Sequence, residues 1–184
     1  HFDNATEPQD LDPHVVTGVP EHRVMTALLE GLVSEDPEGR APRPGVAQTW
    51  EQSADQLVYT FHLRTNALWS NGDRVTARDF VGSYRRMLAP SLASEYAYML
   101  YVMRGAEDFN TGRLTDFEKV GVKALDDLTL QISLQSSAPY FLSLLTHYSW
   151  FPVHLPTVER FGPLYERGNR WTRPGHFVGN GPFT

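Results

Sequence analysis

Residues 49–84 read TWEQSADQLVYTFHLRTNALWSNGDRVTARDFVGSY, and this stretch decides the fold. Its segment 58–64 combines aromatic and β-branched residues in near-alternation, which predicts a β-strand. The Asn-Gly dipeptide at 71–72 predicts a tight turn, because both residue types tolerate positive φ. Thr76 and Asp79 have the spacing of a capping box, which predicts that a helix begins there. The stretch is therefore expected to be a rigid scaffold, and none of its residues is typical of a catalyst.

Shorter segments on both sides of this stretch also carry structural signals. Pro20 followed by Glu21 predicts the start of a helix, because proline suits the first helical position and an acidic side chain suits the first turn. Segments 120–125 and 128–134 alternate around a pair of aspartates, which predicts a β-hairpin. Further helical signals cover residues 46–50 as a short turn, residues 93–103, a segment capped by Ser137 with His147 at its C-terminal end, and residues 157–162.

Composition limits the classes of protein to consider. The chain has 184 residues, of which 41% are hydrophobic and 21% charged, which is typical of a globular domain with a sizeable core. A formal charge of −6 argues against a nucleic-acid partner. Cysteine does not occur in the sequence, which excludes thiol catalysis, zinc-thiolate sites and disulfides. The chain begins with His1 and ends where a strand is predicted to start, so we expect it to be part of a longer protein.

Residues typical of catalysis are not grouped in this sequence. Nucleophile elbows, phosphate-binding glycine loops and paired histidine motifs are not found. The seven histidines show no helical or alternate spacing, which argues against a metal site. Three tyrosines, Tyr96, Tyr98 and Tyr101, could form a ligand-stacking surface or the rim of a core. Composition and pattern alone predict a non-catalytic α/β or α+β domain, with no cofactor and no identifiable ligand.

A set of short motifs runs in order along nearly the whole chain. They are LDPH at 11–14, GVPE at 18–21, EGL at 30–32, PGVA at 44–47, WE at 50–51, YTFHLR at 59–64, WSNG at 69–72, VTA at 75–77, DFV at 79–81, GVKALDD at 121–127, APYF at 138–141, LLTH at 144–147 and NG at 180–181. Each motif is unspecific alone. Together they resemble the oligopeptide-binding proteins of bacterial ABC importers, in extracellular solute-binding protein family 5.

The resemblance implies an incomplete α/β fold of the type II periplasmic-binding-protein kind, with a small domain and part of one main lobe. Residues 1–44 would start lobe I, residues 45–168 would form a small α/β domain II, and residues 169–184 would return into lobe I. The opposite lobe would follow Thr184. In such hinged proteins, the ligand is enclosed as the lobes close.

The resemblance also implies where a peptide would lie. The segment Thr17-Gly18-Val19 matches one that runs along the peptide backbone in the family, and Thr17 stands where relatives can carry an acidic residue. Tyr96 matches a small-domain tyrosine that lines the cleft. His147 matches a histidine that can face the peptide carboxylate, and a position at a helix C-terminus would favour its protonated form.

The function implied by the resemblance is the capture of short peptides in extended form and their delivery to ABC transporter permease subunits. The protein would lie in the periplasm or on the extracytoplasmic face of the cell membrane, and would meet the membrane only through the permease or a lipid anchor. It would not be an enzyme. Three alternatives remain: the same fold with another ligand (murein peptide, nickel chelate, haem, glutathione or a signalling peptide), a hydrolase, and a fragment that binds nothing by itself.

Overall fold

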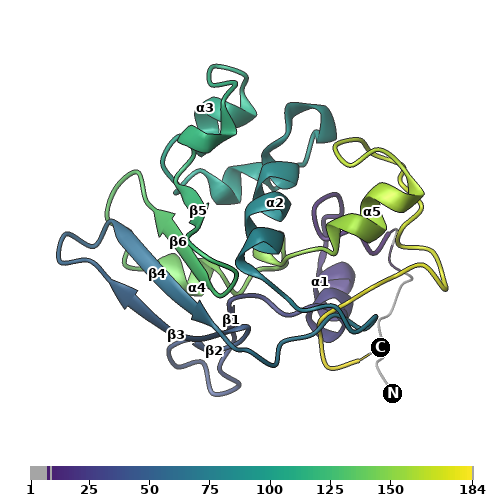
Figure 1. Ribbon diagram of the computed structural model, residues 1–184, viewed down its shortest axis with the longest axis horizontal. Helices are drawn as coiled ribbons and strands as arrows, with labels where there is room; N and C mark the ends of the chain where they lie inside the picture. Colours follow the sequence, from purple (N-terminus) through teal and green to yellow (C-terminus); the bar gives the residue numbers. More distant parts are fainter. Residues whose placement is uncertain (1–7, 9, 184) are drawn as a thin grey trace.

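A four-stranded antiparallel sheet organises the computed structural model, which describes residues 8 and 10–183 (Figure 1). The strands follow one another across the sheet as β3 (Ala47–Gln52), β4 (Val58–Leu63), β6 (Thr129–Ser133) and β5 (Val122–Ala124). Phe61 of β4 lies opposite Trp50 on one side and Leu130 on the other. The strand predicted at 58–64 and the hairpin predicted at 120–134 are therefore confirmed.

The short helical turn predicted at residues 46–50 is wrong, because this segment opens the edge strand β3. Ala47 is the one buried residue of β3, and the rest of the strand is exposed or half-buried. An edge strand of this kind shows little apolar alternation, and it is held by main-chain pairing with β4. The pairing includes a register shift between Ala47 and Thr49.

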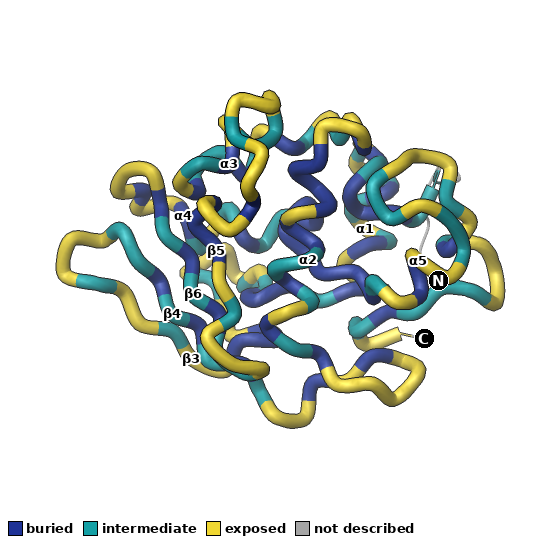
Figure 2. The backbone as a smooth tube through the Cα atoms, turned by 45° about the horizontal axis from the view of Figure 1, so that its top comes forward, coloured by how far each residue is buried: buried dark blue, intermediate teal, exposed yellow. Residues whose placement is uncertain are grey.

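One face of the sheet carries the main hydrophobic core. Tyr59, Phe61, Leu130 and Ile132 are buried, whereas their neighbours on the same strands are half-buried. A chain of aromatic rings crosses from this face to the helices: Tyr59 to Phe141 (4.8 Å between centroids), Phe141 to Trp150 (5.7 Å), and Trp150 to Tyr84 (5.2 Å). Figure 2 shows the buried positions running through the strands and the central helix, and the exposed ones in the loops.

The central helix is α2 (Ala77–Leu88), which lies between the sheet and α5 (Leu155–Phe161) (Figure 1). The predicted capping box is present at its start: the Thr76 side chain accepts from the Asp79 main chain, and the Asp79 carboxylate accepts from the Thr76 N–H at 2.7 Å. The predicted Asn-Gly turn is also present, with Gly72 at φ 93°.

Two predicted helices differ from the structure. Residues 93–103 do not form one helix, because Ala93 adopts a left-handed conformation with φ 50°. Within residues 93–103 only the 3₁₀ helix η2 (Ala97–Leu100) forms, and it lies between the 3₁₀ helix η1 (Pro90–Leu92) and the helix α3 (Ala106–Asn110). The second difference concerns the helix predicted to be capped by Ser137. The helix formed there is α4 (Phe141–Leu144), and Ser137 does not cap it, because the Ser137 hydroxyl donates to Gln56. By contrast, α5 overlaps the helix predicted at 157–162 and ends at Gly162.

The N-terminal helix α1 (Val19–Leu28) starts one residue before the predicted position. The C-terminal segment 179–183 runs beside its end (Figure 1), where the Gly181 N–H donates to the Leu28 carbonyl at 3.0 Å. The strand expected to start in this segment is not formed within the described residues, which form a bend there. The remaining elements are the paired strands β1 (Val33–Ser34) and β2 (Arg43–Pro44), and the 3₁₀ helices η3 (Phe117–Lys119) and η4 (Tyr148–Trp150).

A buried ion pair ties the start of the chain to α2. Arg86, which is fully buried, donates to both carboxylate oxygens of Asp12, at 2.9 and 2.6 Å. The Trp171 indole N–H donates to the same carboxylate at 3.2 Å. In the part of the chain that the structure describes, no helix has the length and apolar character needed to cross a membrane.

Candidate ligand-binding site

The segment Thr17-Gly18-Val19 leads into α1 at the surface of the molecule. Gly18 is the N-cap of α1 and has φ 144°, a conformation that residues with a side chain rarely adopt. A Cβ at this position would also collide with the Glu21 carboxylate. Thr17 is exposed and Val19 is 68% exposed. The segment is thus a fixed turn whose neighbouring residues are open to solvent.

Tyr96 comes from a different part of the chain and is connected to this segment through Tyr148, whose hydroxyl interacts with Tyr96 and with the Gly18 main chain. Tyr96 precedes η2 and is half-buried. Its ring meets the His147 ring edge-on, with 5.2 Å between centroids and an interplanar angle of 85°. It also lies 5.9 Å from the ring of Tyr148. The structure therefore brings Tyr96 and His147 together, as expected if both line one surface.

His147 does not lie at a helix C-terminus, so the reason given for expecting it to be protonated is wrong. It is the N-cap of η4, where its Nδ1 accepts from the Ser149 N–H at 3.2 Å. Burial, with a further contribution from the charge of His22, lowers its pKa from 6.5 to about 4. Since Nδ1 is the acceptor, the ring proton lies on Nε2. At neutral pH, His147 is a neutral hydrogen-bond donor rather than a cation.

Two further residues join the cluster and were missed by sequence reasoning. Tyr148 is buried, donates its hydroxyl to the Val16 carbonyl at 3.2 Å, and stacks on His147 at 4.3 Å. Burial, followed by the nearby Tyr96, raises the pKa of Tyr148. The His22 ring lies 5.6 Å from Tyr148 and 5.9 Å from His147. The cluster comes from separate elements, so no local spacing could reveal it.

The arrangement offers contacts for reversible binding. It combines the solvent-accessible turn at the N-terminus of α1, a neutral imidazole donor and the half-buried ring of Tyr96, with the buried Tyr148 behind them. Among residues 8 and 10–183, no group of three or more His, Cys, Asp or Glu side chains is arranged to hold a metal ion. The aspartate pair of the hairpin lies elsewhere, and Asp127 pairs with Arg78 at 3.1 Å on the surface.

The chain belongs to the bacterial extracellular solute-binding proteins of family 5. Residues 41–184 match the family described as "Bacterial extracellular solute-binding proteins, family 5 Middle". The chain is 44% identical over 185 residues to the periplasmic oligopeptide-binding protein OppA of Escherichia coli (strain K12), covering 98% of this chain and 32% of that protein. It thus spans about a third of the length of the curated relatives it matches.

Solved structures give the same relationship. The crystal structure of Haemophilus influenzae OppA in complex with RPPGFSPFR matches with a TM-score of 0.88 and 42% identity, over 97% of this chain and 34% of that one. The unliganded open form of MppA, a periplasmic murein tripeptide binding protein, matches with a TM-score of 0.86 and 38% identity, over 95% of this chain and 32% of that one. The predicted fold class, an incomplete type II periplasmic-binding-protein fold of α/β type, is confirmed.

Proposed function

We propose that this chain is the part of an extracytoplasmic solute-binding protein that holds one side of a peptide-binding cleft. The whole protein captures short peptides in extended form and delivers them to the permease of an ABC transporter. It works in the periplasm or at the outer face of the cell membrane. The observation that carries this proposal is the convergence of Gly18, Tyr96 and His147 around Tyr148, in a chain that belongs to this family.

The peptide contacts follow from the chemistry of three parts of the site, Thr17-Gly18-Val19, Tyr96 and His147, which we call the wall. The exposed main chain of Thr17-Gly18-Val19 pairs with the peptide backbone, which recognises any sequence. The Tyr96 ring borders the ligand, and the Nε2–H of His147 donates to a peptide oxygen. Thr17 carries no charge, so the acidic partner for the peptide amine belongs to the opposite lobe.

The domain organisation is part of the same proposal. Residues 1–44 and 169–184 belong to lobe I, and residues 45–168 form the small domain that packs onto it. Two hydrogen bonds between the Asn180 amide and the Glu30 main chain, at 3.0 and 2.9 Å, support the assignment of both ends to one lobe. The Trp171 contact with Asp12 supports it as well.

The wall contains no arrangement that activates a nucleophile, and we propose that the protein binds without turnover. Tyr148 has its pKa raised and its hydroxyl bound to a carbonyl, so it is a poor acid or base near neutral pH. His147, with a pKa of about 4, donates its Nε2–H and accepts from Ser149, which suits recognition rather than proton transfer to substrate.

Native mass spectrometry of the full-length protein, purified without denaturation, tests the ligand class. We expect a ladder of masses from co-purified short peptides. A single mass of a metal chelate or haem would overturn the proposal, and a single murein tripeptide mass would replace it with the narrower ligand of the MppA relative.

Calorimetry tests the wall itself. Tyr96→Ala in the full-length protein should weaken the binding of trialanine by up to about tenfold, because the ring covers apolar surface of the peptide, and burial of about 50 Å² at about 25 cal/mol per Å² contributes roughly 1 kcal/mol. The matched control is Tyr140→Ala, since Tyr140 is 62% exposed and has no part in the ring cluster. Equal affinities for both variants would remove Tyr96 from the site.

A further inference from the structure

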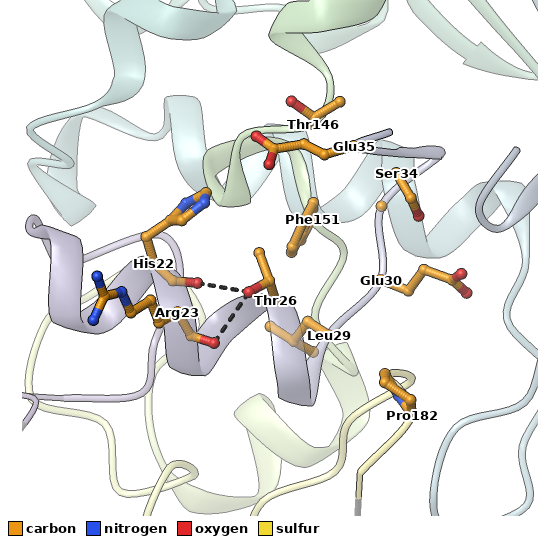
Figure 3. Close-up of a pocket in the computed structure, with 11 residues that line it drawn as sticks. His22, Arg23, Thr26, Leu29, Glu30, Ser34, Glu35, Thr146, Phe151 and Pro182 are labelled. Carbon is orange, nitrogen blue, oxygen red and sulfur yellow. Dashed lines mark hydrogen bonds between the residues drawn. The ribbon is translucent and has the colours of Figure 1, made fainter. Parts of the chain in front are cut away.

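A pocket of about 450 Å³ lies directly beside the ring cluster, between α1 and the segment that carries His147 (Figure 3). Its walls include His22, Thr26 and Leu29 from α1, and Thr146 and Phe151 from the other side. A volume of this size is sufficient for one large side chain. Of the ring cluster, His22 alone lines this pocket, and the residues assigned above to the peptide contacts, Thr17-Gly18-Val19, Tyr96 and His147, do not.

His22 connects the pocket to the wall. Its ring contacts the rings of His147 and Tyr148, and the same side chain lines the pocket. Thr146 also lines the pocket and is the chain neighbour of His147. A side chain that branches from a peptide lying along the wall therefore reaches the pocket by passing His22.

The charges around the pocket leave it suited to an uncharged side chain. Glu30 forms an ion pair with Arg64, and burial raises its pKa. Glu35 and Arg23, which carry opposite charges, are both exposed. In Figure 3 the Arg23 guanidinium extends away from the Phe151 ring. Since Arg23 and Glu35 carry opposite charges and Glu30 is paired with Arg64, the lining has no net preference for a charge of either sign.

The uncharged part of the pocket lining favours an aromatic side chain of the ligand. His22 and Phe151 present aromatic surfaces and Leu29 an aliphatic one, and aromatic pairs gain more than their buried area alone would give. Thr26 donates its hydroxyl to the His22 and Arg23 carbonyls, at 3.1 and 3.0 Å, so its oxygen still accepts from a group such as a phenol.

We propose that this pocket is a subsite for an aromatic side chain of the bound peptide and that His22 determines its specificity. The proposal rests on the proposed function, because the side chain enters from a peptide bound along the wall. It adds a preference for residue type at one peptide position to a wall that otherwise recognises the main chain.

The experiment compares four tripeptides by calorimetry with the full-length protein: trialanine, and the three peptides that carry a single Phe at the first, second or third position. We expect one of the Phe peptides to bind roughly threefold to tenfold more tightly than trialanine. His22→Ala should abolish this preference, measured as the ratio of the Phe-peptide affinity to the trialanine affinity of the same variant. His22→Phe should keep the preference, and His62→Ala, which removes an imidazole from the sheet instead, should leave it unchanged.

The outcomes separate the two proposals. If no tripeptide binds, the proposed function fails. If trialanine binds and no Phe peptide is preferred, or if the preference survives in His22→Ala, the subsite fails while the proposed function stands. If His22→Ala weakens all four peptides equally, His22 belongs to the general wall, and the aromatic subsite is overturned as well.

Discussion

His14 and His147 are two histidines with pKa values of about 4 that arise in different surroundings. His14 is fully enclosed, and burial followed by the charge of Arg86 disfavours its protonated form. His147 is half-buried, and there burial is followed by the charge of His22. Both rings are thus neutral at pH 7. Any bond that His147 makes to a peptide carboxylate has a neutral donor, which is weaker than a bond between two charged groups.

We expect the His147 imidazole to titrate in the folded protein with a pKa of about 4, against 6.5 in an unfolded chain. Between these values the unfolded state binds more protons, so the free energy of unfolding decreases as the pH falls from about 6.5 to about 4. NMR of the ring nitrogens, recorded as a function of pH on the full-length protein, measures the pKa and the tautomer.

The control for this titration is His147→Asn, which keeps an acceptor at the N-cap but cannot be protonated. The variant should lose less stability than the wild type over the same pH interval. A measured pKa at or above 6.5, or a proton on Nδ1 at neutral pH, would contradict the neutral-donor assignment.

At the scale of elements, α2 connects the hydrophobic core to the buried ion pair. Its Phe80 and Tyr84 side chains are fully buried in the main core, and it contributes Arg86 to the buried ion pair. The capping box fixes where this helix begins.

Thr76→Ala should lower the free energy of unfolding by about 1 kcal/mol, because the side chain that accepts the Asp79 N–H is lost. Thr76→Ser keeps the hydroxyl and serves as the control, with a change of less than about 0.5 kcal/mol. Urea unfolding of the full-length protein measures both. Amide hydrogen exchange should be faster in the first turn of α2 in the alanine variant alone; unchanged exchange there would show that the cap does not hold the helix start.

Elements with strong local chemistry could be predicted from the sequence. The strand β4, the hairpin β5–β6 and the start of α2 each carry their own alternation, turn or cap. The strand β3 could not be predicted, because pairing with β4 creates it. The helix break at Ala93 could not be predicted either, because the left-handed conformation there is adopted by an alanine and not by a glycine.

The candidate site also divides into residues that could be predicted from the sequence and residues that only tertiary packing brings in. The resemblance to a known family supplied Gly18, Tyr96 and His147, and the structure brings these residues together. His22 and Tyr148 emerge only from tertiary packing, since their partners lie on other elements. The protonation state of His147 was also misjudged for this reason, because it depends on the actual helix boundaries and on burial.

At the scale of the whole molecule, a buried network joins the three segments that we assign to lobe I and the small domain. Asp12 lies in the first, Arg86 and Leu164 in the second, and Trp171 in the third. Burial alone would raise the pKa of Asp12, but the charge and hydrogen bonds of Arg86 outweigh it and lower the pKa. The network therefore ties these three segments of the chain to one another through buried charges and hydrogen bonds.

Asp12→Asn tests this network, because it leaves the Arg86 guanidinium buried without its counter-charge. Removing one partner of a buried pair costs about 3–5 kcal/mol. Asp127→Asn is the matched control: it breaks the Arg78–Asp127 pair, whose side chains are 78% and 67% exposed, and exposed pairs contribute less than about 1 kcal/mol. Urea unfolding of the full-length protein, followed by tryptophan fluorescence, should show a large loss of stability for Asp12→Asn alone.

The double variant Asp12→Leu with Arg86→Met should recover part of the loss, because no lone charge stays buried. Equal stabilities of Asp12→Asn and Asp127→Asn would mean that the ion pair does not hold the segments together.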